Sequence, residues 1–174
     1  MKVIALDRDG TVMIDRGYLS DPEGVCFEPG AIEALRRLYN GGFQLIFVSN
    51  QSGIGRGLMT AAQSDAVHAR VVEQLTAEGV PILGSYICPH APWDHCRCRK
   101  PSTVLLEQAA AEHAIDFAAS FVIGDKKTDV DLGRGVGSRT VLYAKRSTKD
   151  NEGATPDYRS GSWPEIANWI LTAH

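Results

Sequence analysis

Short apolar runs recur along the chain, and longer stretches with helical periodicity separate them. A strand that is buried on both faces of a sheet reads as a continuous apolar run, often rich in Val, Ile and Leu. The runs at residues 2–6, 44–49, 120–123 and 140–143 fit this description, and residues 85–88 are a weaker candidate. The pattern therefore predicts four strands and a fifth that is less clear.

Helices are predicted between these strands, where apolar residues return every three or four positions. One such run stops at Gly41-Gly42, a typical helix end, and Thr60 with Gln63 forms a capping box that starts another. The predicted helices cover residues 32–39, 60–75, 103–113, 129–135 and 163–171. Residues 145–162 are rich in Lys, Ser, Thr, Gly and Asp, so we expect a mobile loop there.

The alternation of strands and helices predicts an α/β fold. Consecutive strands that are joined by helices form a parallel sheet with helices on both faces, which is a three-layer, Rossmann-like arrangement. The composition, 44% hydrophobic and 22% charged, is that of an ordinary globular protein. A chain of 174 residues is long enough for one full core, so we expect a single domain over residues 1–174.

Charge and hydropathy exclude two classes of partner. The net charge is −3 and no Lys/Arg stripe is present, which argues against nucleic acid and against a zinc-ribbon-like binding module. No apolar run approaches the length of a membrane span. Since the polar pair Asp7 and Asp9 comes too early for a signal peptide, we expect a cytoplasmic protein, and we expect it to be a monomer.

Two carboxylates, Asp7 and Asp9, directly follow the first predicted strand. The carboxyl ends of strands are where open α/β sheets place their chemistry. The pair suits a two-step transfer, with Asp7 as nucleophile and Asp9 first as an acid and later as a base. Because neighbouring carboxylates repel each other, the pair also calls for a cation such as Mg²⁺. The alternative is a solvated acidic turn.

Two more polar segments follow predicted strands. Residues 49–57, Ser-Asn-Gln-Ser-Gly-Ile-Gly-Arg-Gly, offer hydroxyl, amide and backbone donors that can surround a phosphate, although a plain glycine-rich turn is the alternative. After the strand at 120–123, Asp125 can supply a metal ligand and Lys126 can reach a phosphate. Asp129, a few positions later, can cap the next helix.

A cysteine- and histidine-rich segment lies between residues 88 and 98 and leads into Arg99-Lys100. Three thiols and an imidazole suit a four-coordinate structural Zn²⁺ site that would pin this loop. The expected ligands are Cys88, His90, Cys96 and Cys98, with His95 as the rival imidazole. Lys100 offers a compact charge for phosphoryl oxygens, and Arg99 can grip a second anion in bidentate fashion, unless both are simply solvated.

Together these residues resemble the haloacid-dehalogenase-like phosphatases. Over roughly residues 2–145, the chain has segments similar to the four family motifs, in the family's order: Asp7-x-Asp9-Gly10-Thr11, Ser49, Lys100, and Gly124-Asp125 with Asp129. The Cys/His segment, together with Asp15-Arg16-Gly17-Tyr18 and residues 49–57, is similar to the branch that includes heptose-bisphosphate and histidinol phosphatases, and more similar to the former.

The resemblance implies a role for each matching residue. Asp7 would form an aspartyl-phosphate, Asp9 would be the general acid and base, and Ser49 and Lys100 would hold the phosphoryl oxygens. Mg²⁺ would bind the Asp7 carboxylate, the Asp9 backbone carbonyl and Asp125. The residues expected to contact the sugar and its distal phosphate are Asp15, Arg16, Gly17, Tyr18, Asn50, Gln51, Ser52, Arg99 and Lys126.

The activity implied by the resemblance is removal of the 7-phosphate from D-glycero-D-manno-heptose 1,7-bisphosphate. The alternatives are hydrolysis of histidinol phosphate or of another small sugar bisphosphate. No large insertion lies between Thr11 and Ser49 or between Ser49 and Lys100, so no separate cap domain is expected. Substrate selection would then fall to the Cys/His segment and residues 15–18.

Overall fold

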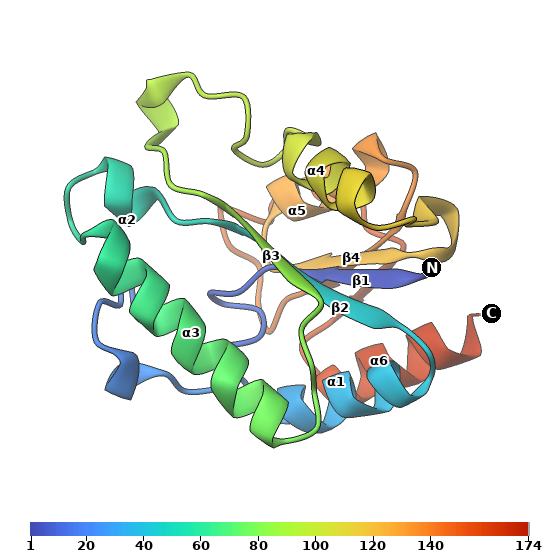
Figure 1. Cartoon of the computed structure of the whole chain (residues 1–174). Coiled ribbons are helices and arrows are strands. Elements are labelled where there is room, and N and C mark those ends of the chain that lie inside the picture. Colours follow the sequence, from blue (N-terminus) through green and yellow to red (C-terminus); the bar gives the residue numbers. More distant parts are fainter. Residues whose placement is uncertain (174) are drawn as a thin grey trace.

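Six strands form one sheet in the order β3-β2-β1-β4-β5-β6 in the computed structural model, which describes residues 1–173 (Figure 1). Every neighbouring pair is parallel, as the sequence predicts. The strands are β1 (Val3–Leu6), β2 (Gln44–Asn50), β3 (Gly84–Cys88), β4 (Phe121–Gly124), β5 (Arg139–Tyr143) and β6 (Tyr158–Ser160).

The strand order reverses beside β1. The chain first runs outward from β1 to β2 and β3, and then crosses to the other side of β1 to form β4 and β5. In open α/β sheets, the crevice beyond the carboxyl ends at such a switch point is where ligands bind. Asp7 follows β1 and Asp125 follows β4, so the topology brings two predicted site residues to this crevice.

Helices cover both faces of the sheet (Figure 1). Ile4 and Leu6 of β1 pack with α1, α3 and α6, whereas Val3 and Ala5 pack with α4 and α5. Because both sets of side chains are buried, the strands carry the continuous apolar runs seen in the sequence. The helices are α1 (Ala31–Asn40), α2 (Ser52–Gly55), α3 (Ala61–Ala77), α4 (Val104–Glu112), α5 (Lys127–Gly135) and α6 (Trp163–Thr172).

Helix α6 is anchored directly to the loop that carries the first aspartates. Trp163, at its first turn, is fully buried and stacks on Tyr143 with ring centroids 5.8 Å apart. Its indole N–H donates to the carbonyl of Thr11 at 2.9 Å. A buried indole needs such a partner. The C-terminal helix therefore holds the backbone of the loop after β1 in place.

The prediction of a loop over residues 145–162 is wrong near its C-terminal end. Tyr158–Ser160 forms the edge strand β6, which pairs with β5 in the register Val141 to Tyr158. An edge strand of three residues that includes Arg159 and Ser160 carries too little apolar periodicity to be recognised. Earlier in the segment, Asn151 is buried, and its side chain accepts from the Thr148 N–H and donates to the Arg146 carbonyl.

The connections that could hold a cap domain are short. Within residues 1–173, the chain between β1 and β2 forms a 3₁₀ turn (Pro22–Gly24) and α1, and the chain between β2 and β3 forms α2 and α3. No separate cap domain is evident in this part of the chain, as expected. None of the helices described over these residues combines the length and hydropathy needed to cross a membrane.

His68 on α3 gives the fold a predictable sensitivity to acid. Burial, together with the nearby Arg8 guanidinium, lowers the pKa of its imidazole from 6.5 to about 4. It contacts Phe47 edge-on, and its Nε2 lies 2.7 Å from Ser85 Oγ. Between pH 6.5 and 4, His68 is therefore protonated in the unfolded chain but neutral in the folded chain. The free energy of unfolding falls as the pH falls through this window.

We expect the free energy of unfolding to drop by about 1–2 kcal/mol more in the parent protein than in His68→Gln between pH 7 and pH 5. Urea unfolding of both proteins at the two pH values measures this difference. Acid effects on other groups cancel because both proteins contain them. Equal losses in the two proteins would show that His68 titrates normally in the folded state.

Candidate active site

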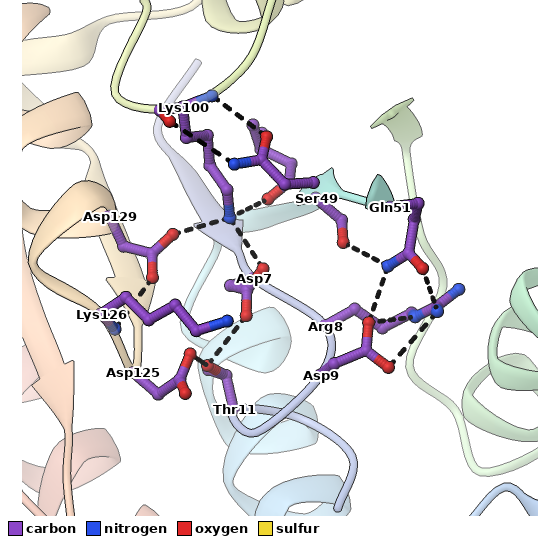
Figure 2. A network of polar contacts seen from close by, with 12 residues as sticks. Asp7, Arg8, Asp9, Thr11, Ser49, Gln51, Lys100, Asp125, Lys126 and Asp129 are labelled. Atoms are coloured by element: carbon purple, nitrogen blue, oxygen red, sulfur yellow. Dashed lines mark hydrogen bonds and ion pairs between the residues drawn. The ribbon is translucent and has the colours of Figure 1, made fainter. Parts of the chain in front are cut away.

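Side chains at the ends of β1, β2 and β4 meet Lys100 at the carboxyl edge of the sheet (Figure 2). Asp7 follows β1, and its backbone N–H donates to the Ile123 carbonyl of β4 at 2.9 Å, which fixes the two strand ends together. A cleft of about 410 Å³ lies beyond these strand ends. Its lining residues are Asp7, Asp9, Tyr18, Asn50, Ser52, Arg56, Arg99, Lys100, Lys126, Thr128 and Asp150.

Lys100 lies at the base of the cleft and is almost fully buried. Its ammonium donates to Asp7 Oδ1 at 2.7 Å, to Asp129 Oδ1 at 2.6 Å and to the Val48 carbonyl at 2.8 Å. These three bonds account for all three of its protons. Its backbone is held as well, since the Lys100 N–H donates to Asn50 Oδ1 at 3.0 Å.

The ion pair sets the charge of the two partners. Burial alone would raise the pKa of the Asp7 carboxyl, but the Lys100 ammonium overcomes this and holds that pKa below its usual range. Burial would lower the pKa of Lys100, and the charges of Asp129 and Asp7 raise it instead. Asp7 is therefore an ionised carboxylate, which is the form that a nucleophile needs.

Asp125 completes a group of three carboxylates whose oxygens lie within 4.8 Å of one another: Asp7, Asp125 and Asp129. Burial, reinforced by the charge of Asp7, raises the pKa of Asp125 to about 8. The Thr11 hydroxyl lies 3.4 Å from both Asp7 Oδ2 and Asp125 Oδ1. Gly10 has φ +81°, and a Cβ there would lie 2.7 Å from Asp125 Oδ2, so only glycine fits.

Asp9 points away from this group, toward Arg8 and Gln51 (Figure 2). Arg8 is buried, and its Nε donates to Asp9 Oδ2 at 3.0 Å. The Gln51 amide donates to the same oxygen at 2.7 Å and to Ser49 Oγ at 2.8 Å. The predicted acid and base thus shares a hydrogen-bond network with the predicted phosphate-binding hydroxyl.

The Cys/His segment folds into a compact cluster after β3. The ligand atoms of Cys88, His90, Cys96 and Cys98 lie within 4.8 Å of one another, and the sulfur–sulfur distances run from 3.0 to 3.8 Å. A tetrahedral zinc site with Zn–S bonds of about 2.3 Å has S···S edges of about 3.8 Å. The Cys88–Cys96 and Cys96–Cys98 distances, 3.7 and 3.8 Å, match this length, and the Cys88–Cys98 distance of 3.0 Å is shorter. His95 is exposed and lies outside the cluster, so the geometry favours His90 over its rival.

This loop packs tightly on α2 at the rim of the cleft. The Gly55 N–H donates to the Pro89 carbonyl at 2.8 Å, and a Cβ at Gly55 would lie 2.4 Å from the backbone nitrogen of Ala91. Next to this contact, the Arg56 guanidinium lies 4.9 Å from the Trp93 ring centroid. A cation over an aromatic face is held electrostatically, so the loop fixes Arg56 at the rim.

The structure distributes the predicted substrate residues unevenly. Tyr18, Asn50, Ser52, Arg99 and Lys126 line the cleft. Asp15, Gly17 and Gln51 line an adjoining hollow of about 260 Å³. Arg16 is exposed and is not among the residues that line either space.

Sequence reasoning missed several residues at the site. Arg56, Thr128 and Asp150 line the cleft. The sequence indicates Asp129 as a helix cap and a motif position, and the structure shows that it also accepts from the Lys100 ammonium at 2.6 Å and from the Lys126 N–H at 3.1 Å. Asp150 carries no signal in the sequence, because it lies in the segment 145–162 that is predicted as a loop. In the structure, the Lys127 N–H donates to the Asp150 carbonyl at 2.7 Å.

Comparison with known proteins identifies the family. A family profile described as HAD-hydrolase-like matches residues 97–163. The chain is 43% identical over 133 residues to the D-glycero-beta-D-manno-heptose-1,7-bisphosphate 7-phosphatase of Helicobacter pylori, which covers 76% of each protein. The chain belongs to the HAD-like phosphatases. The resemblance seen in the motifs is thereby confirmed.

Two further comparisons extend this result. The solved structure of D,D-heptose 1.7-bisphosphate phosphatase from B. bronchiseptica, complexed with magnesium and phosphate, superposes over 100% of both chains with a TM-score of 0.86 and 27% identity. The bifunctional histidine biosynthesis protein HisB of Campylobacter jejuni is 34% identical over 93% of this chain, which spans only 47% of that longer protein. The relatives of this HAD-like phosphatase thus include heptose-bisphosphate phosphatases and a histidine biosynthesis protein.

Proposed function

We propose that this HAD-like phosphatase removes the 7-phosphate of D-glycero-D-manno-heptose 1,7-bisphosphate through an aspartyl-phosphate on Asp7. The observation that carries the proposal is the arrangement of charges in the cleft. A buried Asp7–Lys100 pair lies at its base, and Arg56 and Arg99 lie at its rim. The base suits the phosphoryl group that reacts, and the rim cations suit a second phosphate.

The reaction has two steps. A carboxylate oxygen of Asp7 attacks phosphorus, the bond between phosphorus and the sugar oxygen breaks, and Asp9 gives its proton to that oxygen. Water then attacks the same phosphorus and passes a proton back to Asp9, which frees inorganic phosphate and restores the Asp7 carboxylate. In both steps, Lys100 neutralises the charge of the phosphoryl oxygens from the base of the cleft, and the Ser49 hydroxyl binds them.

The carboxylates beside Asp7 fit a magnesium ion. Oxygen ligands suit Mg²⁺, and the pKa of Asp125, raised to about 8, shows that the nearby lysines only partly offset its burial and the charge of Asp7. Asp129 already accepts from Lys100 and from the Lys126 N–H, so Asp7, Asp125 and the Asp9 carbonyl are the better ligand set. When bound, the ion would supply positive charge to the phosphoryl oxygens.

Histidinol phosphate is the second candidate substrate, favoured by the similarity to HisB. It carries a cationic amine, whereas the rim of this cleft carries Arg56 and Arg99. We therefore expect kcat/KM with Mg²⁺ to be higher on the heptose bisphosphate, and EDTA to remove both activities. A higher kcat/KM on histidinol phosphate would overturn the substrate assignment and leave the phosphatase chemistry intact.

We further propose that Cys88, His90, Cys96 and Cys98 hold a structural Zn²⁺. We expect Cys98→Ser to lower the zinc content below about one ion per chain and to destabilise the fold by about 2 kcal/mol or more. Elemental analysis and urea unfolding measure the two effects. Cys26→Ser is the matched control, because Cys26 lies outside the cluster. Full zinc content in Cys98→Ser would contradict the proposed ligand set.

A further inference from the structure

Both ends of the Gln51 side chain are engaged within the protein. Gln51 follows β2 and is only 6% exposed. Its Nε2 donates to Asp9 Oδ2 at 2.7 Å and to Ser49 Oγ at 2.8 Å, while its Oε1 accepts from Arg8 Nη2 at 2.9 Å. An amide nitrogen has two protons, so both donated bonds form at once. A residue so fully engaged has little capacity left to bind substrate.

The surroundings allow only one orientation of this amide. If it were flipped, Oε1 would face the Asp9 carboxylate and the nitrogen would face the Arg8 guanidinium, so acceptor would meet acceptor and donor would meet donor. Arg8 is itself fixed, because it is 1% exposed and also donates to both oxygens of Asp9, from Nε at 3.0 Å and from Nη2 at 3.3 Å. The fixed Arg8 guanidinium thus determines the orientation of the Gln51 amide.

The two acceptors of Gln51 are the groups that the reaction has to align. Asp9 Oδ2 receives two donors, whereas Oδ1 receives only the longer bond from Arg8, so Oδ1 keeps capacity for a proton. Ser49 Oγ already accepts from Gln51, which leaves its own hydroxyl proton free to donate to a phosphoryl oxygen. One amide therefore sets the direction of both groups.

We propose that Gln51, supported by Arg8, is a positioning residue that holds Asp9 and the Ser49 hydroxyl in reactive alignment. The inference rests on the proposed role of Asp9 as general acid and base. Gln51 touches no reacting atom and acts only through these two neighbours. Its loss displaces the proton donor for the leaving oxygen, and the effect of that loss depends on how much the leaving group needs a proton.

The leaving group supplies a readout that a purely structural role would not change. A sugar alkoxide needs a proton as it departs, whereas p-nitrophenolate leaves without one. We expect Gln51→Met, which keeps the side-chain length but cannot donate, to slow release of the leaving group in the first turnover by about 10- to 100-fold more with the heptose bisphosphate than with p-nitrophenyl phosphate. Single-turnover rapid quench with Mg²⁺ measures both rates.

Three comparison variants isolate the effect. Gln51→Glu keeps an acceptor for Arg8 but loses both donated bonds, so it should match Gln51→Met. Ser49→Ala should slow the two substrates by similar factors, since both carry a phosphoryl group. Gln108→Met, at an exposed position of α4, should change neither rate.

The outcomes separate this inference from the proposed function. Equal slowing of both substrates by Gln51→Met, or no slowing, would overturn the positioning role while the parent enzyme stays active. A parent protein that hydrolyses neither substrate would overturn the proposed function itself. The inference is supported if Gln51→Met and Gln51→Glu, but not the other two variants, lose more rate on the heptose bisphosphate than on p-nitrophenyl phosphate.

Discussion

Asp7→Asn is expected to lower the rate of phosphate release by about 10⁴-fold or more. The change replaces the carboxylate that attacks phosphorus with an amide of the same shape that cannot form the acyl phosphate. In the structure, the Lys100 ammonium keeps Asp7 ionised and lies 2.7 Å from its Oδ1, so Asp7 needs no general base to take its proton. Steady-state phosphate release from the heptose bisphosphate measures the loss.

The fold should tolerate this substitution. Lys100 keeps Asp129 at 2.6 Å as an ionic partner, and the amide oxygen of the new side chain can still accept a hydrogen bond. Asp65→Asn is the matched control, since Asp65 is an exposed residue of α3, and it should retain full activity. If Asp7→Asn released phosphate at a rate near that of the control, Asp7 would not be the nucleophile.

Lys100→Met is expected to abolish activity and to destabilise the fold by about 3–5 kcal/mol at neutral pH. It removes the cation that contacts both Asp7 and Asp129, and leaves these buried carboxylates next to Asp125 with Lys126 as the nearby cation. Burial already raises the pKa of Asp129 despite the opposing charge of Lys100. Without that charge, both carboxyls would have raised folded pKa values. Urea unfolding of the parent and the variant measures the loss.

The same variant has a pH dependence with a defined sign. If the pKa of a carboxyl is higher in the folded than in the unfolded protein, the free energy of unfolding falls as the pH rises from the unfolded pKa toward the folded pKa. The deficit of Lys100→Met should therefore be larger at pH 8 than at pH 5. Lys127→Met, which removes an exposed partner of Asp131, should cost at most about 0.5 kcal/mol at either pH. A small or pH-independent deficit in Lys100→Met would contradict the buried ionic network.

The sequence predicts the sheet well because its central strands are buried on both faces. Continuous apolar runs such as Val3–Leu6 can satisfy only that environment, and the five strands predicted from such runs all form. The edge strand β6 is not predicted, because its short, mixed sequence Tyr158-Arg159-Ser160 is not buried on both faces and has no continuous apolar run. Prediction therefore succeeds where burial constrains composition, is weaker for the edge strand β3, and fails for the edge strand β6.

The candidate site shows the same division. Asp7, Asp125 and Lys100 are recognisable because motif positions at strand ends must converge in this topology. Gln51 reads from the sequence as a phosphate or sugar contact, and only side-chain geometry shows that its amide is occupied by Asp9, Ser49 and Arg8. Arg56 and Trp93 likewise pair only because α2 packs on the Cys/His loop.

The central claim is that phosphoryl transfer passes through Asp7. Its most direct test is rapid acid quench of the enzyme with Mg²⁺ and heptose bisphosphate labelled with ³²P at the 7-phosphate, followed by mapping of the protein-bound label. We predict a hydroxylamine-sensitive acyl phosphate on the peptide that contains Asp7, formed before free phosphate appears and absent in Asp7→Asn. Release of labelled phosphate without label on the protein, or label mapped to another carboxylate, would contradict the account.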